Sequence, residues 1–180
     1  MDNWTTVPGQ VAREGARQDQ HFDPTVLSLT LTLYRALTAY DRAQAGELAP
    51  HGLTTSHLNI LTVLHRVERP LTMGELGRAV SVRPANLTGV VDALTRRGLI
   101  ERRVNPDDRR SYLVATTAAG EAFLADFLPG HWETLKRLTS GLDRDEQAQL
   151  SALLQRFRES VEAAEEAEAE VTAAQGWLAG

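Results

Sequence analysis

Four arginines gather around a short turn in the middle of the chain. They are Arg102, Arg103, Arg109 and Arg110. The runs 100–104 and 111–116 on either side have the alternating, β-branched character of paired strands, and Asn-Pro-Asp-Asp between them has the chemistry of a turn. Asp107 and Asp108 offset part of the positive charge locally. A protruding hairpin with this density of arginine suits a phosphate backbone, so the segment predicts a nucleic-acid contact.

A short helix is predicted before this hairpin, and its start is clearly marked. Thr72 and Glu75 have the spacing of a capping box. Leu71 and Leu76 lie where a hydrophobic staple would fix the entry of the chain. The sequence therefore predicts that a helix starts directly after Thr72.

A second helix is predicted to begin at Pro84, in the first-turn position that proline favours, and to end at Gly98 in a left-handed cap. Its apolar residues recur at helical spacing: Leu87, Val90, Val91 and Leu94. The opposite face carries short residues that let the backbone approach base edges, and an asparagine there can bond adenine with two hydrogen bonds. Those residues are Ala85, Asn86, Thr88 and Gly89. A helix-turn-helix followed by an arginine-tipped wing can contact a major groove and the neighbouring minor groove together.

From about residue 53 to residue 120 the sequence resembles the MarR (multiple antibiotic resistance regulator) family of winged-helix transcription factors. The similar segments are 53–61, 71–76, 91–94, 97–100, the wing residues 108–110, and Thr117 with Gly120. The resemblance implies that Asp108 braces the hairpin by pairing with Arg110, and that Arg110 enters the minor groove. Thr116 departs from the family, which usually has leucine at that position.

The residues and the resemblance together predict a mainly helical winged helix-turn-helix fold with a small β-hairpin wing. The candidate DNA-contact residues are Thr72, Arg83, Pro84, Ala85, Asn86, Thr88, Gly89, Arg102, Arg103, Asp108, Arg109 and Arg110. We expect a flexible arm at 1–22, an N-terminal dimerisation helix within 23–52, the DNA-binding domain at 53–116 and C-terminal dimerisation helices within 117–180. A twofold homodimer would bind double-stranded DNA at a pseudo-palindromic operator, with half-sites about one helical turn apart.

Helical patterns flank the DNA-binding domain. Asp23-Pro24 opens a helix with apolar residues on two faces, and Thr117 caps another helix that Pro129-Gly130 kinks or interrupts. Asp143 and Glu146 start a third helix with a capping-box spacing. The terminal helices carry so much apolar surface that we expect a partner to bury it. The resemblance implies that this partner is a second copy of the chain.

The composition indicates the size of the fold and where its charge lies. The chain has 180 residues, 42% of them hydrophobic, which is enough for one sizeable core. Its net charge is −5, but residues 53–116 hold ten arginines and six acids, so this segment carries +4 and the remainder −9. The acids gather in 143–170, which we interpret as a solvated helix face.

Several signals are absent from the sequence. Without cysteine there are no disulfides, no thiolate catalysis and no cysteine-based sensing. No run of about 18 apolar residues and no export signal occur, so we expect a cytoplasmic protein that does not bind a membrane. No glycine-rich phosphate loop, nucleophile elbow or metalloprotease motif occurs either, so we expect neither an enzyme nor a cofactor.

The five histidines raise the question of a metal. His57 and His65 are eight residues apart, about two turns on one helix, and could not chelate one ion unaided, so we expect no metal site. The resemblance implies instead a small organic effector, often an aromatic acid, held between the first helix, the helix before the helix-turn-helix and the helix after the wing. Candidate ligand-binding residues are Tyr34, His57, Leu61 and Trp132, and each is interpreted equally well as ordinary core. Asn59 stands where urate-responsive members carry aspartate, which argues against that arrangement.

The resulting hypothesis is a DNA-binding repressor of nearby genes that a small aromatic or anionic ligand releases. Two alternatives stay open. One is a metal-responsive regulator that uses His57, His65 or His131. The other is a winged-helix module that binds a protein, in which Arg109 and Arg110 would meet acidic side chains.

Overall fold

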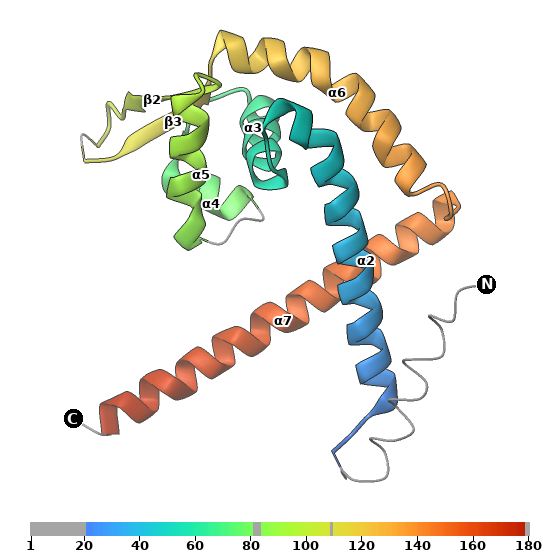
Figure 1. Ribbon diagram of the computed structural model, residues 1–180. Coiled ribbons are helices and arrows are strands. Elements are labelled where there is room, and N and C mark those ends of the chain that lie inside the picture. The colour runs from blue at the N-terminus through green and yellow to red at the C-terminus, as the bar shows by residue number, and fades with distance from the viewer. Residues whose placement is uncertain (1–20, 81–83, 109, 179–180) are drawn as a thin grey trace. The chain divides into compact units, whose positions relative to one another are not determined.

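A computed structural model describes the backbone of residues 21–80, 84–108 and 110–178 (Figure 1). The chain forms two compact units, Met1–His131 and Trp132–Gly180. The predicted arm at 1–22 lies almost wholly outside the described residues. The mainly helical winged-helix fold predicted from the sequence is confirmed.

The first unit carries most of the elements. In chain order they are α2 (Pro24–Leu48), the 3-10 turn η2 (Ala49–His51), α3 (Thr55–Val67), β1 (Leu71–Thr72), α4 (Met73–Ala79), α5 (Pro84–Arg96), β2 (Ile100–Val104), β3 (Tyr112–Thr116) and the start of α6 (Ala118–Leu138). The end of α6 and the long helix α7 (Arg144–Leu178) belong to the second unit. In Figure 1 the β2–β3 hairpin projects from the body of the first unit beside α5.

Side-chain caps set the helix starts. The Asp23 Oδ1 accepts hydrogen bonds from the Thr25 and Val26 amides at 2.7 and 3.3 Å, which confirms the predicted start of α2. In α7 the Asp143 and Glu146 side chains each accept from the other residue's amide, at 2.9 and 2.8 Å, as predicted.

One helix start was not predicted. His57 Nδ1 accepts from the Thr54 amide at 3.0 Å, in the role that glutamate or glutamine usually fills in a capping box. This cap begins α3, and it ties the His57 ring to the helix backbone.

The wing is part of a three-stranded antiparallel sheet of order β1-β3-β2. Its register pairs Ile100 with Thr116 and Val104 with Tyr112, which confirms the predicted hairpin except that the second strand begins one residue later. The third strand, β1, was not predicted. It has two residues, and Leu71, which directly precedes the N-cap residue of α4, pairs with Val114.

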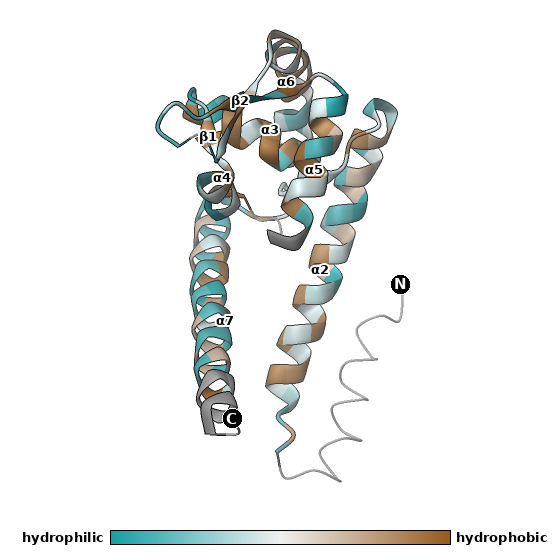
Figure 2. Ribbon diagram, turned by 90° about the vertical axis from the view of Figure 1, so that its left-hand side faces the viewer, coloured by the Kyte–Doolittle hydropathy of each residue, from teal (hydrophilic) through white to brown (hydrophobic). Residues whose placement is uncertain are grey.

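A single apolar core fills the first unit. Its most buried members come from α2, α3, α4, α5, all three strands and α6: Leu48, Ile60, Leu61, Leu64, Leu71, Leu76, Val91, Leu94, Ile100, Val114 and Leu124. Both staple residues of α4 belong to it, as predicted. Along α2, by contrast, apolar residues recur over the whole length of the helix (Figure 2), and Val26, Leu29 and Leu37 are more than half exposed.

Of the predicted kink or interruption at Pro129-Gly130, the interruption is wrong, because α6 runs through Pro129 without a break. Proline removes one backbone hydrogen bond, and the helical residues on both sides are sufficient to continue the helix.

The first turn of α6 approaches the end of α5 very closely. A Cβ on Gly120 would lie 2.1 Å from the Leu99 carbonyl oxygen. The Thr117 amide donates to that oxygen at 3.1 Å, and the Thr117 hydroxyl donates to the Gly98 carbonyl at 2.6 Å. Gly98 itself has φ +69, in the left-handed region predicted for this cap. Thr117 and Gly120 therefore join α6 to the turn that starts the wing.

Replacing Gly120 with alanine should destabilise the fold, because the new methyl group meets backbone that no side-chain rotation can move. We expect a loss of about 1–3 kcal/mol in the free energy of unfolding, measured by urea denaturation followed by circular dichroism. Gly130→Ala, in the same helix with no atom within 4 Å of the new Cβ, is the matched control and should be neutral or stabilising by up to about 1 kcal/mol. Equal stability of the two variants would contradict this account.

Candidate nucleic-acid interface

The start of α4 is held by a network around Glu75. The predicted capping box is confirmed: Glu75 Oε2 accepts from the Thr72 amide at 2.8 Å, and Thr72 Oγ1 accepts from the Glu75 amide at 3.2 Å. Arg69 Nη2 adds a charged hydrogen bond to Glu75 Oε1 at 2.9 Å. Arg69 and the two Thr72 groups hold the pKa of Glu75 down to about 2. The Thr72 hydroxyl is engaged in this cap, so a DNA contact by it would compete with the helix start.

Helix α5 has the buried and exposed faces predicted for a recognition helix. Leu87, Val91 and Leu94 face the core, while Asn86 and Thr88 are exposed. Gly89 has open space around the position of a Cβ. Helix α5 begins at Pro84 as predicted; the side chains of Pro84 and Ala85, and the whole of Arg83, lie outside the described residues.

Arg97, which the sequence analysis did not single out, connects the end of α5 to the turn before α3. Its Nη1 donates to the Gly52 carbonyl at 2.7 Å and its Nη2 to the His51 carbonyl at 2.6 Å. Two parallel hydrogen bonds from one planar guanidinium fix direction as well as distance. No sequence signal pointed to this role, since both acceptors are backbone groups 45 and 46 residues away.

The two arginines of β2 lie on opposite faces of the wing, because successive residues of a strand alternate. Arg102 Nη2 contacts Asp92 Oδ1 on α5 at 2.5 Å. Arg103 Nε donates to Glu101 Oε1 on its own strand at 2.9 Å. Each guanidinium is therefore already beside a carboxylate, and Arg102 ties the wing to the recognition helix.

The base of the wing turn is closed by Asn105. Its Nδ2 donates to Ser111 Oγ at 2.9 Å, its Oδ1 accepts from the Asp107 amide at 3.1 Å, and its side chain is largely buried. From the sequence, Asn105 was predicted only as a turn residue. Its position before proline was the available signal that its side chain would organise the turn.

Among the described residues of the wing tip, Arg110 is exposed to solvent. The Asp108 carboxylate accepts from the Arg110 amide at 3.0 Å, and Arg110 Nε lies 3.9 Å from the same oxygen. The structure thus brings the predicted Asp108 and Arg110 pair together, chiefly through the backbone. The Arg110 side chain is 98% exposed. Arg109 lies outside the described residues.

The four candidate ligand-binding residues lie in unlike surroundings. Leu61 is fully buried in the core, and Tyr34 is 70% exposed on α2. His57 is held in the cap of α3, and burial, with Arg97 nearby, lowers its pKa. Trp132 belongs to the second unit and is exposed. A cleft of about 600 Å³ between α2 and α3 is lined by other side chains, including Leu37, Asp41 and Asn59.

The histidines make pairs with carboxylates. His131 Nδ1 lies 2.8 Å from Glu47 Oε2 in a largely buried contact between α6 and α2, and His65 Nδ1 lies 2.6 Å from Glu121 Oε2. Among the described residues, no three or more histidine, aspartate or glutamate side chains are grouped so that they could hold a metal ion. In the same part of the chain, no helix is long and apolar enough to span a membrane.

An exposed recognition helix beside an arginine-tipped hairpin defines a winged helix-turn-helix protein of the DNA-binding class. A family model described as "MarR family" matches residues 51–111. The multiple antibiotic resistance protein MarR of Salmonella typhimurium is 32% identical over 134 residues, which cover 73% of this chain and 92% of that protein. The transcriptional repressor YetL of Bacillus subtilis is 28% identical over 134 residues, covering 74% and 80%.

A solved structure of a MarR protein also resembles the fold of this chain. A mutant of MarR from Escherichia coli, crystallised with operator DNA, superposes with a TM-score of 0.67 at 28% identity and covers 74% of this chain and 95% of that one. The chain belongs to the MarR family, a family of DNA-binding transcription regulators rather than enzymes.

The pKa of Glu75 gives a test of the α4 start. Because its folded value of about 2 lies below the ordinary value of 4.5, the ionised carboxylate stabilises the fold above pH 4.5, and this stabilisation is lost as the pH falls from 4.5 to about 2. The difference in Tm between wild type and Glu75→Ala should therefore be largest at neutral pH and shrink over that window. Glu166→Ala, which removes an exposed carboxylate of α7, is the control. A Glu75→Ala difference that stays constant across the window would show that the charge of Glu75 does not contribute.

Proposed function

We propose that this protein is a sequence-specific transcriptional repressor that binds its operator as a homodimer and is released by a small ligand. The observation that carries the DNA-binding part is the wing tip, where the Arg110 amide is held by Asp108 while its guanidinium, 3.9 Å from the same carboxylate, is 98% exposed. The relative crystallised with operator DNA supports the same partner for this chain.

In this proposal, α5 and the wing contact different grooves of the DNA. Helix α5 enters the major groove with Ala85, Asn86, Thr88 and Gly89 near base edges, and Arg83 and Pro84 lie at its start. Arg109 and Arg110 enter the adjacent minor groove, with Asp108 as the brace. Arg102, Arg103 and Thr72 are already engaged within the protein. We assign them to the phosphate-facing border of the site.

Dimerisation is proposed for the helices within 23–52 and 117–180, with 53–116 as the DNA-binding domain. On α2, Val26, Leu29 and Leu37 are more than half exposed, and on α7 a stripe of Leu150, Leu154, Phe157 and Val161 is about two-fifths exposed. Such surfaces on two long helices are costly in a monomer. A twofold dimer would cover them and present two recognition helices to a pseudo-palindrome.

Arg110→Ala should weaken operator binding by about tenfold or more, equivalent to about 1.4 kcal/mol, because it removes the exposed cation of the wing. Asp108→Ala should reproduce part of this loss by freeing the Arg110 amide. Both should remain dimers by size-exclusion chromatography. Arg144→Ala, with the same change of charge at the start of α7, is the control for net charge.

The measurement is a gel-shift titration at fixed salt. Unchanged affinity for both wing variants would remove the wing from the mechanism. If wild type, titrated in a second series at several salt concentrations, shows no salt-dependent affinity for any DNA, the module that binds a protein becomes the better hypothesis.

Asn86→Ala tests base recognition by α5. We expect a loss of about 1–3 kcal/mol on the preferred operator and a much smaller loss on random DNA, because a base-edge contact discriminates sequence and a phosphate contact does not. Titration of both DNAs under one buffer gives the two losses. Equal losses would reassign Asn86 to the phosphate backbone.

Release by a small aromatic or anionic ligand is the finer part of the proposal, with Tyr34, His57, Leu61 and Trp132 as candidate contacts. Since Leu61 is fully buried, it can contribute only after the core opens. A ligand that shifts operator affinity ten- to hundredfold needs about 1.4–2.7 kcal/mol of differential affinity for the two forms. If a panel of aromatic acids leaves operator affinity unchanged while a divalent metal alters it, the metal-responsive alternative replaces this one.

A further inference from the structure

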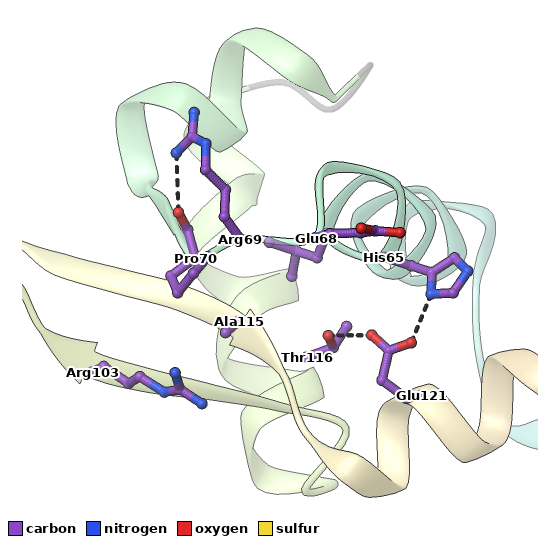
Figure 3. Close-up of a pocket in the computed structure, with 9 residues that line it drawn as sticks. His65, Glu68, Arg69, Pro70, Arg103, Ala115, Thr116 and Glu121 are labelled. Carbon is purple, nitrogen blue, oxygen red and sulfur yellow. Dashed lines mark hydrogen bonds and ion pairs between the residues drawn. The ribbon is translucent and has the colours of Figure 1, made fainter.

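A cleft of about 420 Å³ lies in the first unit, between the end of α3, the sheet and the first turns of α6 (Figure 3). Leu64, Pro70 and Ala115 give it an apolar lining. Its size falls within the range of small-molecule sites. None of the four candidate effector residues lines it.

The two arginines of the cleft are already paired with carboxylates that do not line it. Arg69 donates to Glu75, and Arg103 Nε donates to Glu101 Oε1 at 2.9 Å. A guanidinium beside a carboxylate contributes little net field to a neighbouring site. The cleft is therefore poorly suited to an anion, although two arginines line it.

Neither of the two carboxylates that line the cleft, Glu68 and Glu121, is paired with an arginine in the described part of the chain. Glu121 accepts one hydrogen bond from the Thr116 hydroxyl and one from His65 Nδ1 at 2.6 Å, and Figure 3 shows it between these two groups. These bonds lower the pKa of Glu121, so it is ionised at neutral pH and above. A hydroxyl carries no charge, and an imidazole is uncharged above the range in which histidine ordinarily titrates.

Glu68 is the second carboxylate. It is exposed at the end of α3, lines the cleft, and has no ion-pair or hydrogen-bond partner for its side chain within the described ranges. With both arginines neutralised, Glu68 and Glu121 leave the cleft with negative charge beside an apolar wall.

We propose that this cleft binds an organic cation with a flat apolar body, such as an arylamidinium. The planar fork of an amidinium matches a carboxylate as a guanidinium does, and the aromatic ring would lie against Leu64, Pro70 and Ala115. None of the candidate effector residues lines this cleft, and a cation has the opposite charge to an anionic effector, so the two sites are distinct. Because Arg103 and Thr116 come from β2 and β3, the bound cation would touch both strands of the wing.

Three probes of almost identical shape test the charge preference. Benzamidine, benzamide and benzoate are cationic, neutral and anionic, and each is titrated into the full chain at pH 8 by isothermal titration calorimetry. We expect benzamidine to bind at least about tenfold more tightly than either of the others, because only it gains from both carboxylates. Equal or weaker binding of benzamidine would overturn the proposal.

Substitutions at Glu68 test whether benzamidine binds in this cleft. Glu68→Gln keeps size and hydrogen bonding and should weaken benzamidine about five- to tenfold, while Glu166→Gln on α7 should leave it unchanged. Glu68 has φ +57, a conformation that glycine adopts without strain, so Glu68→Gly should raise Tm while it also weakens benzamidine. The gain in Tm shows that any loss of binding is not a loss of folding. Benzamidine affinity that is the same in wild type, Glu68→Gln and Glu68→Gly would place the binding elsewhere and overturn the proposal.

Discussion

The turn between α5 and β2 is the junction on which the geometry of the DNA-binding unit depends. Gly98 reverses the chain there in a left-handed conformation, and its carbonyl and that of Leu99 both accept hydrogen bonds from Thr117 at the start of α6. Gly120 allows this approach because no larger residue fits against Leu99. From the other side, Arg97 joins the same turn to the loop before α3. The recognition helix α5 and the wing are therefore joined to α6 and to the loop before α3 at this one turn.

The arginines of the wing differ in their surroundings between its base and its tip. At the base, Arg102 meets Asp92 and Arg103 meets Glu101, so these guanidinium groups serve the structure of the hairpin. At the tip, Arg110 is held through its amide and leaves its guanidinium in solvent. The acids that give the chain its net charge of −5 lie mostly outside residues 53–116, which carry +4. A local positive field on a negative protein is sufficient for DNA, because screening makes nearby charges dominate.

Local rules predicted most of the fold. The caps at Asp23, Thr72 and Asp143, the left-handed Gly98 and the β2–β3 hairpin depend on residues close together in the sequence, where side-chain chemistry acts directly. Some missed contacts are local, such as the His57 cap of α3, but others are nonlocal. The pairing of β1 with β3, and the hydrogen bonds of Arg97 to backbone carbonyls, arise only when distant segments meet. Leu61 shows the converse, because helical spacing predicts an apolar face but cannot distinguish a core side chain from the wall of a ligand cleft.

The central claim is that one rigid unit contacts a major groove and the adjacent minor groove at the same time. It is tested most directly by footprinting the wild-type chain on an operator selected from random DNA, with dimethyl sulfate for guanine N7 in the major groove and hydroxyl radicals for the minor groove. We expect each half-site to show major-groove protection with minor-groove protection directly beside it, and the same pattern to recur about one helical turn away. Major-groove protection with no protected minor groove next to it would contradict the account.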